Sequence, residues 1–301
     1  MSTNIIDELL WRDAINQQTD AEGLRDYVEN NKISLYCGVD PTGDSMHIGH
    51  LIPFMMLKRF QLLGHHPYIL IGGADQWGNI TAGLDLIRKK EGAEAKAFGL
   101  TIPLMLKADG TKFGKTAGGA IWLDPEKTSP YEFYQFWLNQ DDRDVVRYLK
   151  FFTFLTQEEI EDLAKKVETE PHKREAQKTL AREMTLFVHG KEALADALTI
   201  TEALFSGDVK QLTAHQIEDG FKNMPNVTAK KEATNIVDWL VETAIEPSKR
   251  QAREDVENGA ISINGDKVTD TSIEINPASA INETFMIVRK GKKNYTLVTF
   301  K

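Results

Sequence analysis

The chain has 301 residues, of which 41% are hydrophobic and 27% are charged, an ordinary composition for a globular protein of two or three domains. The formal net charge of −9 argues against a generally basic coat, so any contact with RNA has to come from a local basic patch. The single Cys37 excludes an internal disulfide, and no apolar run is long enough to span a membrane, so we expect a cytoplasmic protein.

The beginning of the chain predicts a helix, a strand, a loop and a second helix. Residues 1–31 mix acidic and apolar side chains, which indicates an amphipathic helix rather than a signal peptide. Residues 33–36 have the character of a buried strand, and the Gly, Pro and Asp residues that follow predict a loop. From His47 onward an apolar stripe predicts a helix. Such a loop commonly binds phosphate, because backbone N–H groups and the helix dipole point at the anion.

Two histidines mark the start of this helix. His47 and His50 lie one helical turn apart, an arrangement compatible with a plain helix cap, a phosphate site or a metal site, although no third ligand is near in sequence. The stretch 112–116, Lys-Phe-Gly-Lys-Thr, favours phosphate, since two lysines that flank a glycine form a mobile cationic loop. A P-loop ATPase or kinase is a weaker alternative, because three residues separate Gly110 from Gly114 where the motif requires four.

An alternation of strands and helices lies between these two stretches. We expect a strand at 68–71 that ends in Gly72-Gly73, a helix at 80–90 and another strand at 98–106. The order β-α-β-α-β predicts a parallel sheet with binding residues at the carboxyl ends of its strands. Asp75 and Gln76 would lie at that edge, although Asp75 could equally cap the next helix.

The middle of the chain is predicted to be helical. Ser129 and Thr156 each precede a glutamate by three residues, a pattern typical of capped helix starts, and helical sequence continues to about residue 221 with breaks at Gly190 and Gly207. Aromatic residues expected in the core of this part are Phe133, Tyr134, Phe136, Trp137, Phe151, Phe152 and Phe154.

The tail has the pattern of a small separate domain. A polar linker is expected at 223–231, followed by helices at 236–244 and 248–258 and a tight hairpin at Asn264-Gly265. Basic side chains gather on one side of the second helix and in the last hairpin, while acidic residues occupy the other side of that helix. The tail is therefore locally basic, which fits either a solvated surface or a contact with RNA phosphates.

These motifs together resemble a known family. The tetrapeptide His47-Ile48-Gly49-His50 with the Lys-Phe-Gly-Lys-Thr loop is similar to class I aminoacyl-tRNA synthetases, in the bacterial tyrosyl-tRNA synthetase form, and the tail resembles the S4 RNA-binding domain. The resemblance implies an α/β fold. It comprises a Rossmann-like parallel-sheet catalytic domain at 1–125, a helical domain at 126–222 and a small α+β S4-like RNA-binding domain at 232–301.

The resemblance also implies a reaction and a set of partners. ATP, with Mg²⁺, would activate tyrosine to the adenylate, and the tyrosyl group would then pass to tRNA(Tyr). No side chain acts as nucleophile, so catalysis rests on positioning and on stabilising charge on the leaving phosphates. No tightly bound cofactor, no metal held by the protein alone and no membrane contact are expected.

Each candidate residue receives a role from this resemblance. Tyrosine would meet Tyr36, with Asp75 and Gln76 at the rim of its pocket. The nucleotide would contact Gly38, Asp40, His47, Gly49, His50 and Lys115. The phosphate chemistry would fall to Thr42, His47, Lys112, Lys115 and Thr116. The RNA contacts would be Lys249, Arg250, Arg253, Arg289, Lys290, Lys292 and Lys293.

One departure from the family is large. Family members carry a long insertion between two strands of similar sequence, whereas here Ile71-Gly72-Gly73 serves as both, so a segment of about a hundred residues, the size of a small domain, is expected to be missing near residue 73. The family is homodimeric through that segment, which also supplies part of its tyrosine pocket. We therefore expect a monomer or a poorly defined aggregate with impaired tyrosine binding. The alternative function is a catalytically inactive form that retains RNA binding through its tail. Residues 69–71 are still expected to be buried.

Overall fold

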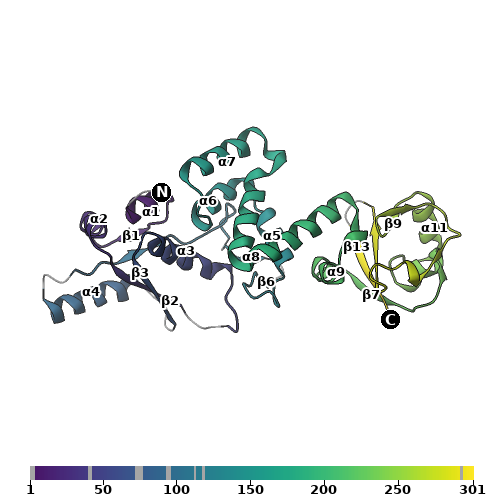
Figure 1. The fold of residues 1–301 in the computed structure, drawn as a ribbon, viewed down its shortest axis with the longest axis horizontal. Coiled ribbons are helices and arrows are strands. Elements are labelled where there is room, and N and C mark those ends of the chain that lie inside the picture. The colour runs from purple at the N-terminus through teal and green to yellow at the C-terminus, as the bar shows by residue number, and fades with distance from the viewer. Residues whose placement is uncertain are drawn as a thin grey trace. The chain divides into compact units, whose positions relative to one another are not determined.

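The computed structural model describes residues 4–39, 43–71, 77–92, 96–111, 113–116, 119–291 and 294–301; at 39, 70–71, 77–83 and 115–116 it describes the backbone only. The chain divides into two compact units (Figure 1). Unit 1 contains residues 1–128 and 135–188, and unit 2 contains residues 129–134 and 189–301. Among the described residues, no helix has the length and apolar character needed to cross a membrane.

Unit 1 begins with two helices rather than the single predicted one. Helix α1 (Ile5–Trp11) is capped by the side chain of Asn4, and α2 (Ala21–Asn30) is capped by Asp20, whose carboxylate accepts the Gly23 N–H at 2.8 Å. The prediction was wrong in merging them, because Asp20 competes for backbone N–H groups and starts a new helix. The two-residue strand β1 (Gln17–Gln18) lies between them.

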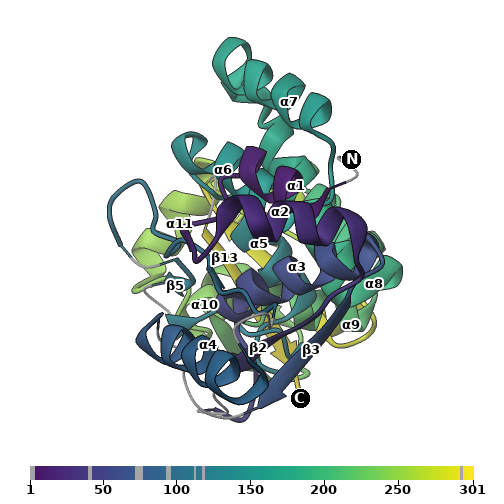
Figure 2. The same cartoon turned by 90° about the vertical axis from the view of Figure 1, so that its left-hand side faces the viewer.

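The first part of unit 1 contains a parallel pair of strands. Strand β2 (Ser34–Val39) pairs in register with β3 (His66–Ile71), and the crossover between them is helix α3 (Ile48–Leu62), which packs against both (Figure 2). Helix α4 (Trp77–Glu91) follows β3. The helix predicted from His47, the helix predicted at 80–90 and the strand predicted to end at residue 71 are confirmed, with bounds that differ by a few residues.

The predicted third parallel strand was wrong. Strand β4 covers only Leu100–Thr101 and pairs antiparallel with β1, so the parallel sheet has two strands among the described residues. With no further strand beside the pair, burial is poorer than expected: Tyr36 is 63% exposed and Ile69 is 50% exposed. The expectation that residues 69–71 are buried was therefore wrong for Ile69, while the side chains of Leu70 and Ile71 lie outside the described set.

Two buried arginines join the first helices to the helical part of unit 1. Arg12 forms an ion pair with Glu8 at 2.8 Å and donates to the carbonyl of Leu155 at 2.7 Å. Arg59 donates to the carbonyls of Phe151 and Thr153, both at 2.8 Å. These carbonyls lie at the C-terminus of α6 (Asp142–Phe152), where positive charge is favourable. Burial, together with the neighbouring Arg12, lowers the pKa of Arg59 to about 9.

The helical elements follow the predicted caps. In α7 (Gln157–Thr169) Thr156 and Glu159 form a reciprocal capping box, and Ser129 and Glu132 exchange the same two hydrogen bonds at the start of α5 (Pro130–Leu138). Helix α8 (Glu175–Ser206) is interrupted at Gly190, where φ is 87°. Most of the predicted aromatic core is buried, with Phe136 and Phe154 partly exposed.

Unit 2 contains a five-stranded sheet in the order β10-β9-β12-β13-β7. The strands are β7 (Asn226–Ala229), β9 (Ile261–Ile263), β10 (Asp266–Val268), β12 (Phe285–Lys290) and β13 (Asn294–Phe300). The region predicted as a linker at 223–231 therefore includes an edge strand, β7, which pairs parallel with β13. That prediction was wrong because Pro225 and the polar residues around it resemble a loop, and only pairing with β13 makes the segment a strand.

Both faces of this sheet are covered. Alternate residues of β12 and β13, such as Met286 and Val298, pack under α10 (Ile236–Glu242) and α11 (Lys249–Glu257). Their neighbours Ile287 and Leu297 pack on the other face with the end of α8 and with α9 (Ala214–Phe221). The predicted helices and the hairpin at Asn264-Gly265, where both residues have positive φ, are confirmed. The remaining short elements are β5 (Lys115–Thr116), β6 (Gly119–Ala120), β8 (Thr234–Asn235), β11 (Glu274–Ile275) and the 3₁₀ turns at 171–173, 209–211 and 277–279.

Candidate active site

The N-terminus of α3 is closed by its own histidines. His47 is the N-cap, and its Nδ1 accepts the Gly49 N–H at 3.0 Å, while Nδ1 of His50 accepts the His47 N–H at 3.1 Å. The centroids of the two imidazole rings lie 4.1 Å apart, and the ring planes are tilted by 36°. Histidine thus performs both halves of a capping box that is usually made by Ser or Thr with Glu.

This cap fixes the chemistry of both rings. Because Nδ1 is the acceptor in each case, the proton of each neutral imidazole is on Nε2, the nitrogen on the other side of the ring. An anion that approaches these rings would therefore meet N–H donors. Gly49 is required by the same geometry, since a Cβ at this position would lie 2.7 Å from the His47 ring.

The backbone amides of the first turn are already engaged. Ile48 donates to the carbonyl of Ile121 at 2.9 Å, Gly49 donates to the His47 ring, and His50 donates to the His47 carbonyl at 2.9 Å. The amides of residues 48–50 are therefore not free for phosphate, and the amides of residues 40–42 in the preceding loop lie outside the described residues. The helix dipole and the Nε2–H group of His50 are features of this turn that favour an anion.

A segment that the sequence did not single out holds this turn in place. Residues 121–123 run antiparallel to the start of α3, and Leu123 donates to the carbonyl of Met46 at 2.8 Å. The ring centroids of Trp122 and His47 lie 6.2 Å apart in an edge-to-face contact, and the ammonium of Lys127 lies 4.9 Å from the Trp122 ring centroid. Lys127 also forms an ion pair with Asp44, which lowers the pKa of that carboxyl. A lone tryptophan shortly after the sequence Gly-Gly-Ala is a weak signal, so this role could not be predicted.

The loop around Gly114, in the Lys-Phe-Gly-Lys-Thr stretch, lies beside the N-terminus of α3. Gly114 has φ of 88°, and a Cβ there would lie 3.2 Å from Ile48, so the loop passes directly against the first turn of α3. Phe113 anchors this loop in the core: its ring centroid lies 5.0 Å from the ring centroids of both Tyr148 and Phe152. Lys115–Thr116 form strand β5, which pairs antiparallel with β6. A P-loop would open a helix at this point, so that alternative is excluded.

Several predicted site residues lie outside what the structure describes. These are Asp40, Thr42, Asp75, Gln76, Lys112, Lys292 and Lys293, and for Lys115 and Thr116 only the backbone is described. His47, Gly49, His50 and the loop at Gly114 are brought together. Tyr36 and Gly38 belong to β2, the strand that leads to this turn, and the Tyr36 ring is mostly exposed. No cluster of His, Cys, Asp and Glu suited to a metal ion occurs among the described residues.

The basic residues of the tail differ in how far they are already paired. Lys249 forms an ion pair with Asp238 at 2.7 Å. Lys290 lies between Glu246 at 2.8 Å and Asp255 at 2.9 Å. Arg250 and Arg253 are exposed on α11, and none of the ion pairs formed by the described residues includes them. Among the described members of the predicted RNA-binding set, these two arginines are the most available cations.

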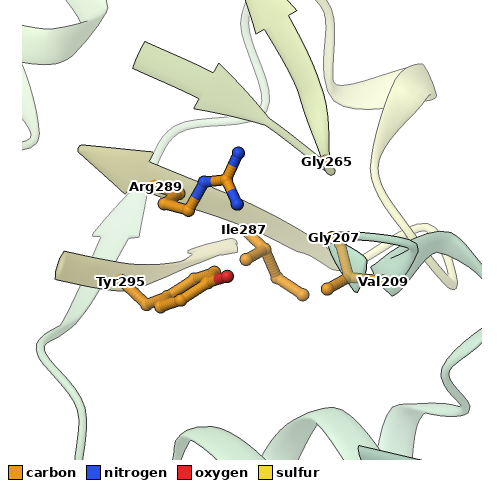
Figure 3. A pocket seen from close by; sticks show the side chains of 6 residues that line it. All are labelled: Gly207, Val209, Gly265, Ile287, Arg289 and Tyr295. Carbon is orange, nitrogen blue, oxygen red and sulfur yellow. The ribbon is translucent and has the colours of Figure 1, made fainter. Parts of the chain in front are cut away.

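Arg289 lies at a small pocket within unit 2 (Figure 3). It is opposite Tyr295 on the neighbouring strand, and the pocket is completed by Gly207, Val209, Gly265 and Ile287. Gly265 has to be glycine, because a Cβ there would lie 2.0 Å from the Gly207 carbonyl oxygen. The pocket therefore belongs to the close packing of the hairpin turn against the end of α8.

Comparison with known proteins identifies the family to which the chain belongs. The family described as tRNA synthetases class I (W and Y) matches residues 28–74 and 69–206, and the Tyrosine--tRNA ligase SYY-like C-terminal domain matches residues 216–298. Tyrosine--tRNA ligase 2 of Bacillus cereus (strain ATCC 10987 / NRS 248) is 53% identical over 98% of this chain and 99% of that protein. This chain belongs to the tyrosyl-tRNA synthetases. Tyrosine--tRNA ligase 1 of Enterococcus faecalis (strain ATCC 700802 / V583) is also 53% identical, with the same coverage.

The fold has a solved counterpart among these synthetases. A C-terminally truncated mitochondrial tyrosyl-tRNA synthetase of Aspergillus nidulans aligns with a TM-score of 0.55 and 21% identity, covering 67% of this chain and 93% of that one. The match supports the predicted class of fold, an α/β class I synthetase.

The comparisons also reveal a gap. The alignments with the Bacillus and Enterococcus proteins extend over 415 and 412 positions, although this chain has 301 residues. More than a hundred residues of each relative therefore have no counterpart here. The two matched segments of the family model overlap at 69–74, so this short stretch matches the model twice. Both findings agree with the expected loss of a segment near residue 73, at the carboxyl end of β3.

Proposed function

We propose that this chain binds ATP at the first turn of α3 and uses it in the ligation of tyrosine to tRNA. The observation that carries the proposal is the reciprocal histidine cap, which puts the proton of both His47 and His50 on Nε2 beside the loop that contains Gly114. A neutral N–H donor can bind an anion directly, because it is not held in an ion pair that the anion would first have to displace. Lys112, Lys115 and Thr116 would add charge from the loop, and Thr42 would contribute from the turn before the helix.

In this mechanism the protein stabilises charge rather than attacking the substrate. The tyrosine carboxylate attacks the α-phosphorus of ATP, pyrophosphate leaves, and the terminal ribose hydroxyl of the tRNA then takes the tyrosyl group. Donors fixed by a helix cap need no reorganisation as charge develops on the leaving phosphates. Mg²⁺ would bind together with ATP, and Gly38, Asp40 and Gly49 would contact the nucleotide.

We further propose that tyrosine is bound weakly by this chain. Tyr36, the candidate wall of the tyrosine pocket, is 63% exposed, and Asp75 and Gln76 would stand at an edge that lacks the neighbouring segment of the relatives. A buried ammonium group without its partners costs about 3–5 kcal/mol, which would weaken tyrosine binding by two orders of magnitude or more. The same missing segment leads us to expect a monomer.

Calorimetric titration with Mg²⁺-ATP tests the nucleotide site directly. ATP should bind to one site per chain, and pyrophosphate should compete with it, because the proposed contacts are to the phosphates. Adenosine should bind far more weakly than ATP. If ATP does not bind, or if pyrophosphate leaves its affinity unchanged, the histidine cap is only a structural feature.

A second candidate function is RNA binding by unit 2 without catalysis. It is favoured by the exposure of Arg250 and Arg253 on α11. Binding of tRNA(Tyr) should weaken with salt, and reversal of both arginines to glutamate should reduce the slope of that dependence by about two. Lys249→Glu is the matched control. The ammonium of Lys249 is already paired with Asp238, so its loss should reduce RNA binding less.

A further inference from the structure

Four side chains close a ring of contacts around the turn that precedes α3. Asp44 forms an ion pair with Lys127, and the Lys127 ammonium lies 4.9 Å from the centroid of the Trp122 ring. The Trp122 ring in turn makes an edge-to-face contact with His47, at a centroid distance of 6.2 Å. Because Asp44 and His47 are three residues apart in the chain, these contacts return to the segment from which they start. We call Asp44, Lys127, Trp122 and His47 the clasp.

The backbone around Trp122 and Lys127 is folded into a compact turn. The Trp122 N–H donates to Oγ1 of Thr128 at 3.0 Å, and the N–H groups of Lys127 and Thr128 donate to the Asp124 carbonyl at 3.1 and 3.0 Å. This turn brings the Lys127 ammonium over the tryptophan ring, and tryptophan is the aromatic side chain that binds such a cation best. Rotation of the Trp122 ring away from His47 would therefore break the contact with Lys127.

The same segment continues the Lys-Phe-Gly-Lys-Thr stretch. Strand β5, at the end of that stretch, pairs with β6, and the residue after β6 is Ile121, whose carbonyl accepts the Ile48 N–H at 2.9 Å. Leu123 then donates to the Met46 carbonyl at 2.8 Å. The backbone that leaves the β5–β6 hairpin thus runs along the start of α3, and the clasp joins the end of this segment to Asp44.

We infer that the other three members of the clasp are positioning residues for His47: they fix the orientation of its ring and thereby raise the affinity of this turn for phosphate. The inference rests on the proposed function, in which the His47 ring contacts the phosphates of ATP. A donor contributes most when its orientation is fixed beforehand, because no side-chain freedom is then lost on binding. The hydrogen bond to Nδ1 holds one side of the ring, and the edge-to-face contact with Trp122 restricts its remaining rotation. Lys127 acts through Trp122 and does not have to touch the ligand.

Calorimetric titration of Lys127→Met with Mg²⁺-ATP tests the inference. This variant loses a surface ion pair and a cation–π contact, both of modest strength, so ATP binding should weaken by about five-fold. Lys127→Arg can keep both contacts and should restore most of the affinity. Asp44→Asn combined with Lys127→Met should bind no more weakly than Lys127→Met alone, because both changes act through one contact. Adenosine, which has no phosphates, should bind all variants equally.

The matched control is Lys150→Met, which removes the lysine of another ion pair in the same unit. Lys150 pairs with Asp13 at 2.7 Å, and its side chain is 29% exposed, against 30% for Lys127. Lys150→Met should bind ATP as the parent does, and urea unfolding should show that both variants keep the fold. The inference is overturned if Lys127→Met binds ATP as tightly as the parent, or if the two variants lose affinity equally.

The imidazole nitrogen resonances of the chain provide a readout that does not require ATP. In a chain with isotopically labelled histidine, the signals of His47 are assigned by their loss in His47→Asn. They should shift in Lys127→Met and stay in place in Lys150→Met. His47 signals that are unchanged in Lys127→Met would contradict the inference even if ATP binds. Shifted signals in a chain that does not bind ATP would refute the proposed function while confirming that the clasp orients His47.

Discussion

Substitution of His47 separates its two roles, because the cap uses Nδ1 and the proposed phosphate contact uses Nε2. Asn is among the best N-cap residues, so His47→Asn can still accept the Gly49 N–H but has no donor at the position of Nε2. His47→Ala loses both. The cap is one hydrogen bond of 3.0 Å at a half-exposed turn, so its loss should cost about 1 kcal/mol of unfolding free energy. A hydrogen bond to a charged phosphate is worth about 2 kcal/mol, or about thirty-fold in affinity.

Two measurements on the same proteins check this. Urea unfolding should show the parent and His47→Asn to be equally stable and His47→Ala to be less stable by about 1 kcal/mol. Calorimetric titration with Mg²⁺-ATP should show both variants to be weakened by about thirty-fold. The reasoning about the cap is refuted if Asn is as destabilising as Ala. The reasoning about the donor is refuted if His47→Asn binds ATP as tightly as the parent does.

Three further predictions concern stability. Glu8→Gln leaves two buried guanidinium groups at the end of α6 without their carboxylate and should cost about 3–5 kcal/mol in urea unfolding. Burial, helped by nearby positive charge, lowers the pKa of His65, so the unfolded state binds more protons near and below pH 6.5. Unfolding free energy should therefore fall as the pH drops from 7.5 to 5, and His65→Gln should flatten this dependence. Finally, a fragment of residues 216–301 should melt at a higher temperature than one of residues 232–301, which lacks β7; equal melting temperatures would contradict the role of that edge strand.

Local signals predicted the helices and caps well. Ser129 with Glu132, Thr156 with Glu159, and the hairpin at Asn264-Gly265 depend on residues within a few positions of one another, so the sequence carries their geometry directly. The failures are non-local. Residues 98–106 have the composition of a strand, yet a strand needs a partner, and here only Leu100–Thr101 find one in β1.

The candidate site likewise has local features that the sequence could predict and non-local features that it could not. The pairing of His47 with His50 follows from helical spacing, and the sequence predicted it. The bonds from the backbone to their Nδ1 atoms are also local, but the bond from the Ile48 amide to the carbonyl of Ile121 depends on a segment some seventy residues away and could not be predicted. The exposure of Tyr36 likewise depends on the lack of a third strand in this sheet among the described residues, and a local apolar pattern cannot show whether a strand has a neighbour.

The central claim is that this chain keeps its ATP site but has lost the closure of its tyrosine pocket. The most direct test is to titrate tyrosine and Mg²⁺-ATP separately into the purified chain and to follow tyrosine-dependent exchange of pyrophosphate into ATP in the same preparation. The account predicts measurable ATP binding, tyrosine binding weaker than ATP binding, and little or no exchange. Tyrosine binding at micromolar concentration, accompanied by rapid exchange, would show that the shortened chain has rebuilt its pocket and would contradict the account.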